Sequence, residues 1–143
     1  MNKAKLIIIR GLPNSGKSTL AMDIADTYIH ADWVEADHYF ESFDENDELV
    51  YNFDASQLSN AHDWCYSETA NSLKEGNLVI VSNTFTTIKE MQPYVDLAKQ
   101  FGAELQVITC TGVVGDNGHG VPAATVEKMR NRFVHKLPEE WFK

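Results

Sequence analysis

Residues 11–19 read GLPNSGKST and match the pattern G-x-x-x-x-G-K-[ST]. In this pattern the glycines let backbone N–H groups point at phosphate oxygens, the lysine supplies a mobile cation, and the next hydroxyl is a ligand for Mg²⁺. The loop needs a strand before it and a helix after it, because a helix N-terminus also attracts phosphate. The run Leu6–Arg10 is expected to form the strand, and the helical spacing of apolar residues in 17–28 predicts the helix. We therefore expect a nucleoside triphosphate here, with Ser18 as the Mg²⁺ ligand. The expected nucleotide contacts are Gly11, Asn14, Ser15, Gly16, Lys17, Ser18 and Thr19.

Asp37 is the candidate for the group that activates an attacking hydroxyl. It follows the expected strand 33–36, and the ends of parallel strands open onto the crevice in which a ligand lies. A carboxylate there can accept the hydroxyl proton and orient attack on the γ-phosphate; the alternative is a solvated surface acid. The strand expected at 78–81 is followed by Ser82 and Asn83 rather than by a second acid. Mg²⁺ would then be held by Ser18, the phosphates and water, with Asp37 nearby.

Apolar runs and helical spacings alternate along the chain, which is typical of a parallel sheet covered by helices on both faces. The expected strands are 6–10, 33–36, 78–81 and 105–108, and the expected helices are 17–28, 55–74, 87–101 and a basic final helix after Pro122. Asp54 is expected to cap the second helix, and Thr87 with Glu90 to form a capping box on the third. Residues 38–53 are expected to form a long, partly helical loop, and the glycine-rich residues 111–120 a lid. The sequence thus predicts one three-layer α/β domain over residues 1–143, with about four or five parallel strands.

The charge of the chain is unevenly distributed. The 143 residues carry a net charge of −9, and residues 18–73 contain thirteen acids but neither lysine nor arginine. Such a surface repels polyanions, because proteins bind nucleic acid largely through these two cations; a solvated acidic face is the simpler interpretation. Cys65 and Cys110 lack metal or redox spacing and are expected to be reduced. No apolar run is long enough to span a bilayer, so we expect a cytoplasmic chain with no membrane partner.

Beyond the phosphate loop, the sequence resembles the polynucleotide kinase-like P-loop kinases, a likeness that extends from about Leu6 to Arg132. The further motifs that carry it are, in chain order, ADHYF at 36–40, YNFD at 51–54 with Leu58 and Ala61-His62 after it, SNT at 82–84, EMQPY at 90–94, and NGHGVP at 117–122 with Val126 and Met129 after it. The resemblance implies ATP-dependent transfer of the γ-phosphoryl group to a hydroxyl. It also implies that Asp37 is the general base and that Val121 packs on the adenine.

Three positions depart from that family. Asp116 stands where polynucleotide kinase has a lid arginine, and Phe40 stands where it has an arginine that clamps the phosphate of the acceptor. The third departure is the missing acid after 78–81. Because an anion replaces a cation that stabilises the transferred group, we expect either slow catalysis or a contribution from Arg130 or Arg132 of the final helix.

Several other residues are candidates for contacts. Those expected at the acceptor or the lid are His38, Asn83, Asn117, His119 and Arg130. His62 is expected to be packed and hydrogen-bonded. The aromatic residues Tyr39, Phe40 and Phe43 are expected in the core rather than as a stacking platform for a base.

Three functions remain open from the sequence. The first is a kinase that uses ATP and Mg²⁺ to phosphorylate a hydroxyl on DNA or RNA, on a nucleotide, or on a modified hydroxymethyl base. The second is a kinase for an unrelated small metabolite, which the acidic region and Phe40 favour. The third is an ATP-binding module without catalytic activity, which Asp116 favours. The sequence identifies neither the acceptor nor the oligomeric state.

Overall fold

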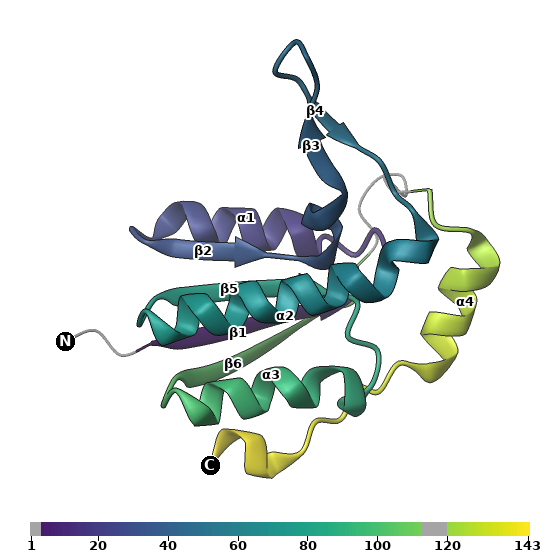
Figure 1. Cartoon of the computed structure of the whole chain (residues 1–143). Coiled ribbons are helices and arrows are strands. Elements are labelled where there is room, and N and C mark those ends of the chain that lie inside the picture. The colour runs from purple at the N-terminus through teal and green to yellow at the C-terminus, as the bar shows by residue number, and fades with distance from the viewer. Residues whose placement is uncertain (1–3, 113–119) are drawn as a thin grey trace.

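The structure, a computed structural model, describes residues 4–112 and 120–143. At its centre lies a parallel sheet whose described strands run in the order β2-β5-β1-β6 (Figure 1). These strands are β1 Lys5–Gly11, β2 Ala31–Val34, β5 Leu78–Asn83 and β6 Glu104–Cys110. The α-helices are α1 Lys17–Thr27, α2 Leu58–Lys74, α3 Ile88–Gln100 and α4 Ala123–Arg132. The shorter elements are η1 Ala36–Phe40, β3 Glu41–Phe43, β4 Leu49–Tyr51, η2 Ala55–Gln57 and η3 Glu139–Phe142. The expected α/β fold with a parallel sheet is confirmed.

The central strands β1 and β5 explain why helices cover both faces of the sheet. Leu6 and Ile8 pack with residues of α2 and α3, whereas Ile7 and Ile9 pack with residues of α1. β5 pairs with β1 in parallel and places Ile80 beside Ile7. Since successive side chains of a strand point to opposite faces, an unbroken apolar run needs a helical layer on each side.

Among the strand ends that differ from the sequence prediction, those of β2 and β5 concern the candidate site. The expected strand 33–36 is wrong at its end, because β2 stops at Val34 and the chain turns into the 3₁₀-helix η1. β5 continues through Ser82 and Asn83, which were expected to follow the strand but pair with β1. The prediction from the apolar run ended this strand too early, because backbone pairing continues through polar residues whose side chains have buried partners.

The region expected to be a partly helical loop, 38–53, contains a β-hairpin. β3 and β4 pair antiparallel, and Figure 1 shows them standing out from the body of the molecule. Asp44 builds the turn, because its carboxylate accepts hydrogen bonds from the backbone N of Asn46 (2.8 Å) and of Glu48 (3.0 Å). A turn of this kind depends on one local side chain, so hydrophobic spacing did not reveal it.

Both predicted N-caps form, but the predicted capping box does not. The Asp54 carboxylate accepts a hydrogen bond from Ser56 N (3.0 Å) and opens η2, which leads into α2. The Thr87 hydroxyl accepts one from Glu90 N (3.3 Å) at the start of α3. Glu90 does not complete the expected capping box, because its carboxylate accepts hydrogen bonds from the backbone N and the hydroxyl of Thr86 instead.

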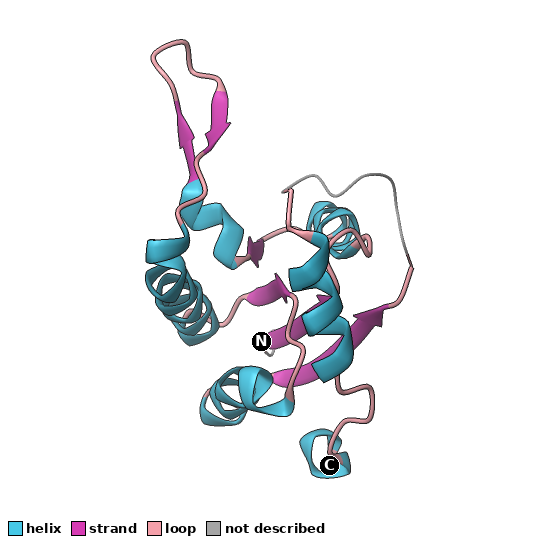
Figure 2. Cartoon of the chain, turned by 90° about the vertical axis from the view of Figure 1, so that its right-hand side faces the viewer, coloured by secondary structure: helices cyan, strands magenta, loops and turns pink. Residues whose placement is uncertain are grey.

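The chain after α4 returns to the sheet through a buried arginine. Arg10 of β1 is fully buried, and its guanidinium donates to the carbonyl oxygens of Phe85 (3.0 Å) and Val134 (2.5 Å). The guanidinium carbon also lies 4.2 Å from the centre of the Phe133 ring. Because Phe133 directly follows α4, these contacts hold that helix in front of the carboxyl ends of the strands, as Figure 2 shows.

Two expectations about the whole chain can be compared with the structure. Within residues 4–112 and 120–143, no helix is long and apolar enough to cross a membrane. Cys65 and Cys110 are both free thiols.

Candidate functional site

A cavity of about 590 Å³ opens at the carboxyl ends of β1, β2 and β5. The described residues that line it are Pro13 to Thr19, Glu35 to Asp37, Tyr51, Phe53, Leu58, His62, Ser82 to Thr84, Gly120 to Pro122, Thr125 and Met129. The fold thus gathers the phosphate loop, Asp37, Asn83 and Val121, which are far apart in the sequence, around one space.

The loop between β1 and α1 has the backbone geometry that phosphate binding needs. Asn14 and Gly16 have positive φ angles of 66° and 89°, so the chain curls tightly before the helix. Gly11 has no room for a side chain, since a Cβ there would lie 2.8 Å from the carbonyl oxygen of Cys110 and closer still to the Ser15 hydroxyl. The Ser15 hydroxyl is buried and has no hydrogen-bond partner among the described residues. This curled loop, followed by a helix without an acid in its first turn, fits an anionic ligand.

Lys17 begins α1 and lines the cavity. Its Nζ donates a long hydrogen bond of 3.4 Å to the carbonyl oxygen of Leu12. Burial lowers the pKa of Lys17, and the negative charges of Glu35 and Asp37 partly oppose that effect. A partly desolvated ammonium at a helix N-terminus is a strong site for phosphate oxygens.

Glu35 lies in the middle of a hydrogen-bond network beneath this loop. Its Oε2 accepts hydrogen bonds from the hydroxyls of Ser18 (3.0 Å) and Ser82 (2.6 Å). Glu35 is 5% exposed, and Nε2 of His38 lies 3.7 Å from its other oxygen. The sequence did not distinguish Glu35 from the other acids of residues 18–73. The available signal was its position two residues before Asp37, at the end of a strand.

Asp37 lies in η1 and has a partner from the hairpin. The Tyr51 hydroxyl of β4 donates a hydrogen bond of 2.9 Å to Oδ1 of Asp37. Burial raises the pKa of Tyr51, and the neighbouring charge of Asp37 raises it further. Tyr51 therefore stays protonated and acts as a donor that orients the carboxylate. The YNFD motif contains Tyr51, but only the hairpin shows which residue it contacts.

Asn83 and His38, both expected at the acceptor, have partners within the protein. Asn83 lines the cavity, and its side chain accepts a hydrogen bond from Ala36 N (2.9 Å) and donates one to Cys65 Sγ (3.5 Å). Asn83 thereby joins the end of β5 to the start of η1, directly before Asp37. His38 is not among the described lining residues, and its ring packs edge-on against Trp33 with 4.7 Å between the ring centres.

His62 and two aromatic residues differ from expectation. The expected packed position of His62 is wrong, because this residue is exposed and lines the cavity. The expected core position is right for Phe40, which is buried, and wrong for Tyr39 and Phe43, which are exposed. The hairpin carries Phe43 away from the sheet. Because Phe40 belongs to the core, the position of the family's arginine clamp supplies no polar contact for an acceptor here.

The expected cations of the final helix do not lie in the cavity. Arg130 is exposed and forms an ion pair with Glu127 of the same helix. Arg132 donates a hydrogen bond from Nε to the Thr86 hydroxyl (2.9 Å). Neither arginine lines the cavity, and Lys17 is the only lysine or arginine among its described lining residues.

Residues Gly120 to Pro122, which directly precede α4, line the cavity. Val121, which the family resemblance places on the adenine, lines the cavity together with Met129 of α4. The expected lid is described only at its two ends. Asp116, Asn117 and His119 lie outside the described residues.

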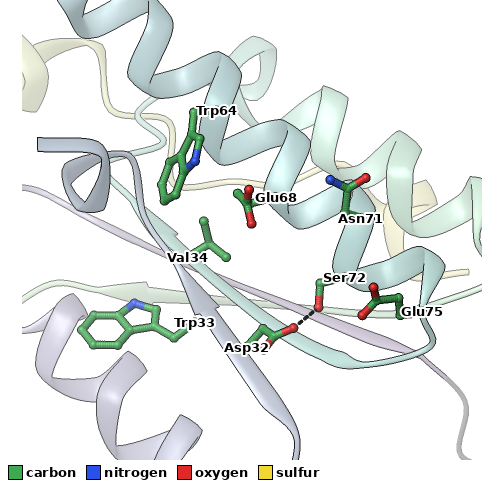
Figure 3. Close-up of a pocket in the computed structure, with 8 residues that line it drawn as sticks. All are labelled: Asp32, Trp33, Val34, Trp64, Glu68, Asn71, Ser72 and Glu75. Atoms are coloured by element: carbon green, nitrogen blue, oxygen red, sulfur yellow. Dashed lines mark hydrogen bonds between the residues drawn. The ribbon is translucent and has the colours of Figure 1, made fainter. Parts of the chain in front are cut away.

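A smaller cavity of about 320 Å³ lies between β2 and α2, and Figure 3 shows the residues that line it. A hydrogen bond from Ser72 to Asp32 joins the helix to the strand there. Trp33 also lines this cavity, while its indole N–H donates to the Ser82 hydroxyl (2.9 Å) and so reaches the network around Glu35. The described lining of the smaller cavity has no lysine or arginine, which distinguishes it from the cavity at the phosphate loop.

Comparisons with known proteins find relatives of part of this sequence and solved structures that share its fold. Human NEDD4-binding protein 2 is 32% identical over 96 residues, which are 66% of this chain and 5% of the human protein. This chain therefore corresponds to a small part of that relative. Among solved structures, the Pnkp1/Rnl/Hen1 complex has a TM-score of 0.60 at 19% identity, covering 97% of this chain and 42% of that chain. The Mycobacterium tuberculosis APS kinase CysC, in complex with AMPPNP and APS, has a TM-score of 0.57 at 18% identity, covering 92% of this chain and 76% of that chain.

One family matches most of the sequence. The family described as AAA domain (AAA_33) matches residues 6–112, which include the phosphate loop, Glu35, Asp37 and, apart from Lys5, the described strands of the parallel sheet. The solved structures, at identities below 20%, show that the fold is shared with P-loop kinases. The chain belongs to the AAA domain family AAA_33.

Proposed function

We propose that the protein is a kinase that transfers the γ-phosphoryl group of ATP to a hydroxyl group, with Mg²⁺ as its metal ion. The observation that carries this proposal is that Asp37, oriented by Tyr51, lines the same cavity as Lys17 and Ser18. One space thus contains a proton acceptor, a cation for phosphates and a hydroxyl that can bind a metal. An ATP-binding module would need the last two but not the first.

Each group has a defined part in the proposed reaction. The acceptor oxygen attacks the γ-phosphorus in line with the bond to the leaving ADP oxygen, and its proton passes to the Asp37 carboxylate. A new acceptor O–P bond forms, and the bridging P–O bond of ATP breaks. Lys17 and the N–H groups of the loop balance the charge that moves onto ADP. Ser18 would hold Mg²⁺, which would supply further positive charge to the phosphates of ATP.

We propose that the acceptor hydroxyl belongs to a nucleic acid, a nucleotide or a modified base, as the likeness to polynucleotide kinase-like P-loop kinases implies. Tyr51 and Phe53 line the cavity with Asp37 and offer aromatic faces on which a base can stack. Lys17, which serves the phosphates of ATP, is the only lysine or arginine of the described lining. A hydroxyl on a base or a nucleoside therefore suits this cavity better than the 5′ end of a long strand, whose phosphates need cations.

A small metabolite is the second candidate for the acceptor. The buried position of Phe40 favours it, because the cavity gains no cation from the place at which polynucleotide kinase has an arginine. A metabolite that carries several hydroxyls and no phosphate would need no such cation. It would need polar partners instead, of which His62 and Asn83 line the cavity.

The experiment that tests the proposed function follows label from γ-labelled ATP into a panel of acceptors. The panel contains 5′-hydroxyl DNA and RNA, hydroxymethylated DNA, nucleosides and small polyols, each with Mg²⁺. We expect label in one class, and loss of that label in both Lys17→Ala and Asp37→Asn. ATP binding without transfer to any acceptor would contradict the kinase and favour the binding module.

A further inference from the structure

We propose that Glu35 is the positioning residue for the Mg²⁺ site, and that it acts through the Ser18 hydroxyl. The inference rests on the proposed function, since both place ATP and Mg²⁺ at the phosphate loop. It assigns to Glu35 of the segment after β2 the negative charge that the end of β5 lacks.

The direction of the hydrogen bonds carries the first step. A serine hydroxyl has one proton to donate and two lone pairs to offer. In the structure, Ser18 donates its proton to Oε2 of Glu35 over 3.0 Å. The lone pairs of Ser18 are thereby left for a cation. A serine that spent a lone pair on a donor would be a weaker ligand, so a carboxylate acceptor at this point prepares Ser18 for the metal.

The network behind Glu35 holds it in this role. The Trp33 indole N–H donates to the Ser82 hydroxyl (2.9 Å), and Ser82 in turn donates to the same Oε2 (2.6 Å). Each member of this chain has one donor direction, so the orientation at Trp33 fixes the orientation at Ser82. Glu35 thus receives two hydroxyl protons at one oxygen, which keeps its charge directed at Ser18.

Burial supplies an independent reason for a cation here. Glu35 is 5% exposed, and a buried carboxylate is costly unless charges or hydrogen bonds compensate it. Its hydrogen-bond donors are two neutral hydroxyls, and the nearest titratable nitrogen, Nε2 of His38, is 3.7 Å from the other oxygen. The charge of Lys17 also acts on this group. A divalent ion at Ser18 would add the positive charge that hydroxyls cannot provide.

The pairing of β2 with β5 explains why a carboxylate can reach Ser18 from the end of either strand. β2 and β5 are adjacent and parallel, with Val34 beside Val81. Glu35 and Ser82 each follow directly, and their side chains meet at 2.6 Å. A carboxylate on Glu35 therefore reaches the same point that an acid at position 82 would occupy. The acid that is missing after Val81 is therefore replaced by Glu35, which follows the neighbouring strand.

The test measures how much Mg²⁺ strengthens the binding of AMPPNP, by titration calorimetry in Mg²⁺ and in EDTA. We expect Glu35→Gln to reduce the Mg²⁺-dependent gain in affinity about ten- to hundredfold. Its affinity in EDTA should equal or exceed that of the wild type, because a negative charge near the phosphates has been removed. Asp32→Asn removes a carboxylate from the same strand outside this cavity, and should leave the gain unchanged.

A rescue variant separates this role from general support of the fold. In the double variant Glu35→Gln with Ser82→Asp, the carboxylate returns from β5, and we expect most of the Mg²⁺-dependent gain to return with it. A folded Glu35→Gln variant with the wild-type gain would overturn the inference, and so would an equal loss of affinity in Mg²⁺ and in EDTA. If Glu35→Gln does not fold, Glu35→Asp keeps the charge but shortens its reach; a wild-type gain there would equally overturn it.

Binding of AMPPNP involves no phosphoryl transfer, so the two proposals fail in different ways. A wild-type protein that transfers label normally while Glu35→Gln keeps the full Mg²⁺-dependent gain contradicts only the role of Glu35. A protein that transfers no label but loses the gain in Glu35→Gln contradicts only the kinase.

Discussion

The Tyr51 hydroxyl donates a hydrogen bond of 2.9 Å to Oδ1 of Asp37, and this contact joins the hairpin to the proposed general base. We expect Tyr51→Phe to lower kcat about ten- to hundredfold, because a hydrogen bond to a charged group contributes about 1.5–3 kcal/mol. The KM for ATP should change little, since Tyr51 lies on β4 and not in the phosphate loop. Steady-state kinetics with the labelled acceptor measure both. Tyr39→Phe, which alters an exposed tyrosine outside the cavity lining, is the matched control; equal kcat values for the two variants would contradict the role of Tyr51.

The buried charge of Lys17 is expected to lower the stability of the folded protein. Burial lowers its pKa below the ordinary value of 10.5, so the folded protein at neutral pH holds a charge that the unfolded chain solvates better. Lys17→Met should therefore raise the Tm of the nucleotide-free protein at pH 7, while it weakens AMPPNP binding at least about tenfold.

The sign of this effect depends on pH. As the pH rises through the lowered pKa of Lys17 towards 10.5, the folded protein loses the proton first and the cost of the buried charge disappears. The Tm advantage of Lys17→Met should thus be full near pH 7 and shrink towards pH 10.5. A lower Tm for Lys17→Met at pH 7, measured by calorimetry, would show that burial of this charge is not a net cost.

Arg10 is expected to support both stability and nucleotide binding, because it fastens the chain that follows α4. Arg10→Lys cannot reproduce the paired hydrogen bonds to Phe85 and Val134 and the stacking on Phe133. We expect it to lower the free energy of unfolding by about 1–3 kcal/mol, since one ammonium nitrogen cannot reach both carbonyl oxygens as the guanidinium does and leaves a buried acceptor unpaired. Urea unfolding measures the loss.

Arg130→Lys is the matched control, since Arg130 is exposed and its ion pair with Glu127 contributes less than about 1 kcal/mol. Hydrogen exchange adds a local readout: α4 should exchange faster in Arg10→Lys and unchanged in Arg130→Lys. Equal stability and equal exchange in the two variants would contradict the anchoring role of Arg10.

Substitutions at two glycines are expected to affect nucleotide binding and stability separately. Gly11→Ala places a Cβ 2.8 Å from the Cys110 carbonyl oxygen, so the phosphate loop must shift and AMPPNP binding should be lost. Gly76→Ala has open space but keeps a φ of +84°, and should cost about 1–2 kcal/mol of stability with normal binding. Calorimetric titration and thermal unfolding of both variants test this. Normal AMPPNP affinity in Gly11→Ala would contradict the geometry of the loop.

The parts of the fold that follow from local sequence were predictable. Local residue types indicate which faces are buried, through the apolar runs of β1 and β5 and the apolar spacing of α1 to α3. The glycines of the phosphate loop likewise indicate its tight backbone turn. Residues 13–19 and Asp37, which line the larger cavity, were singled out on this basis. These elements needed no knowledge of which strand lies beside which.

The parts that depend on neighbours in space were not predictable. Glu35 acquires its partners only because β2 lies beside β5, and Tyr51 meets Asp37 only because Asp44 turns the hairpin. The burial of Arg10 depends on a chain return more than one hundred and twenty residues later, at Val134. Composition places an arginine or an acid at the surface by default, so side chains of this kind are the ones that spacing misassigns.

The measurement that tests the central claim most directly compares Asp37→Asn with the wild type in two assays on the same preparations. One assay is transfer of label from γ-labelled ATP to the acceptor class that the wild type labels, and the other is the affinity for AMPPNP in Mg²⁺. We predict that transfer falls about 10²- to 10⁴-fold, as expected for loss of a general base, while the affinity stays that of the wild type. Unchanged transfer, or an equal loss in both assays, would contradict the assignment of Asp37 as the group that accepts the proton.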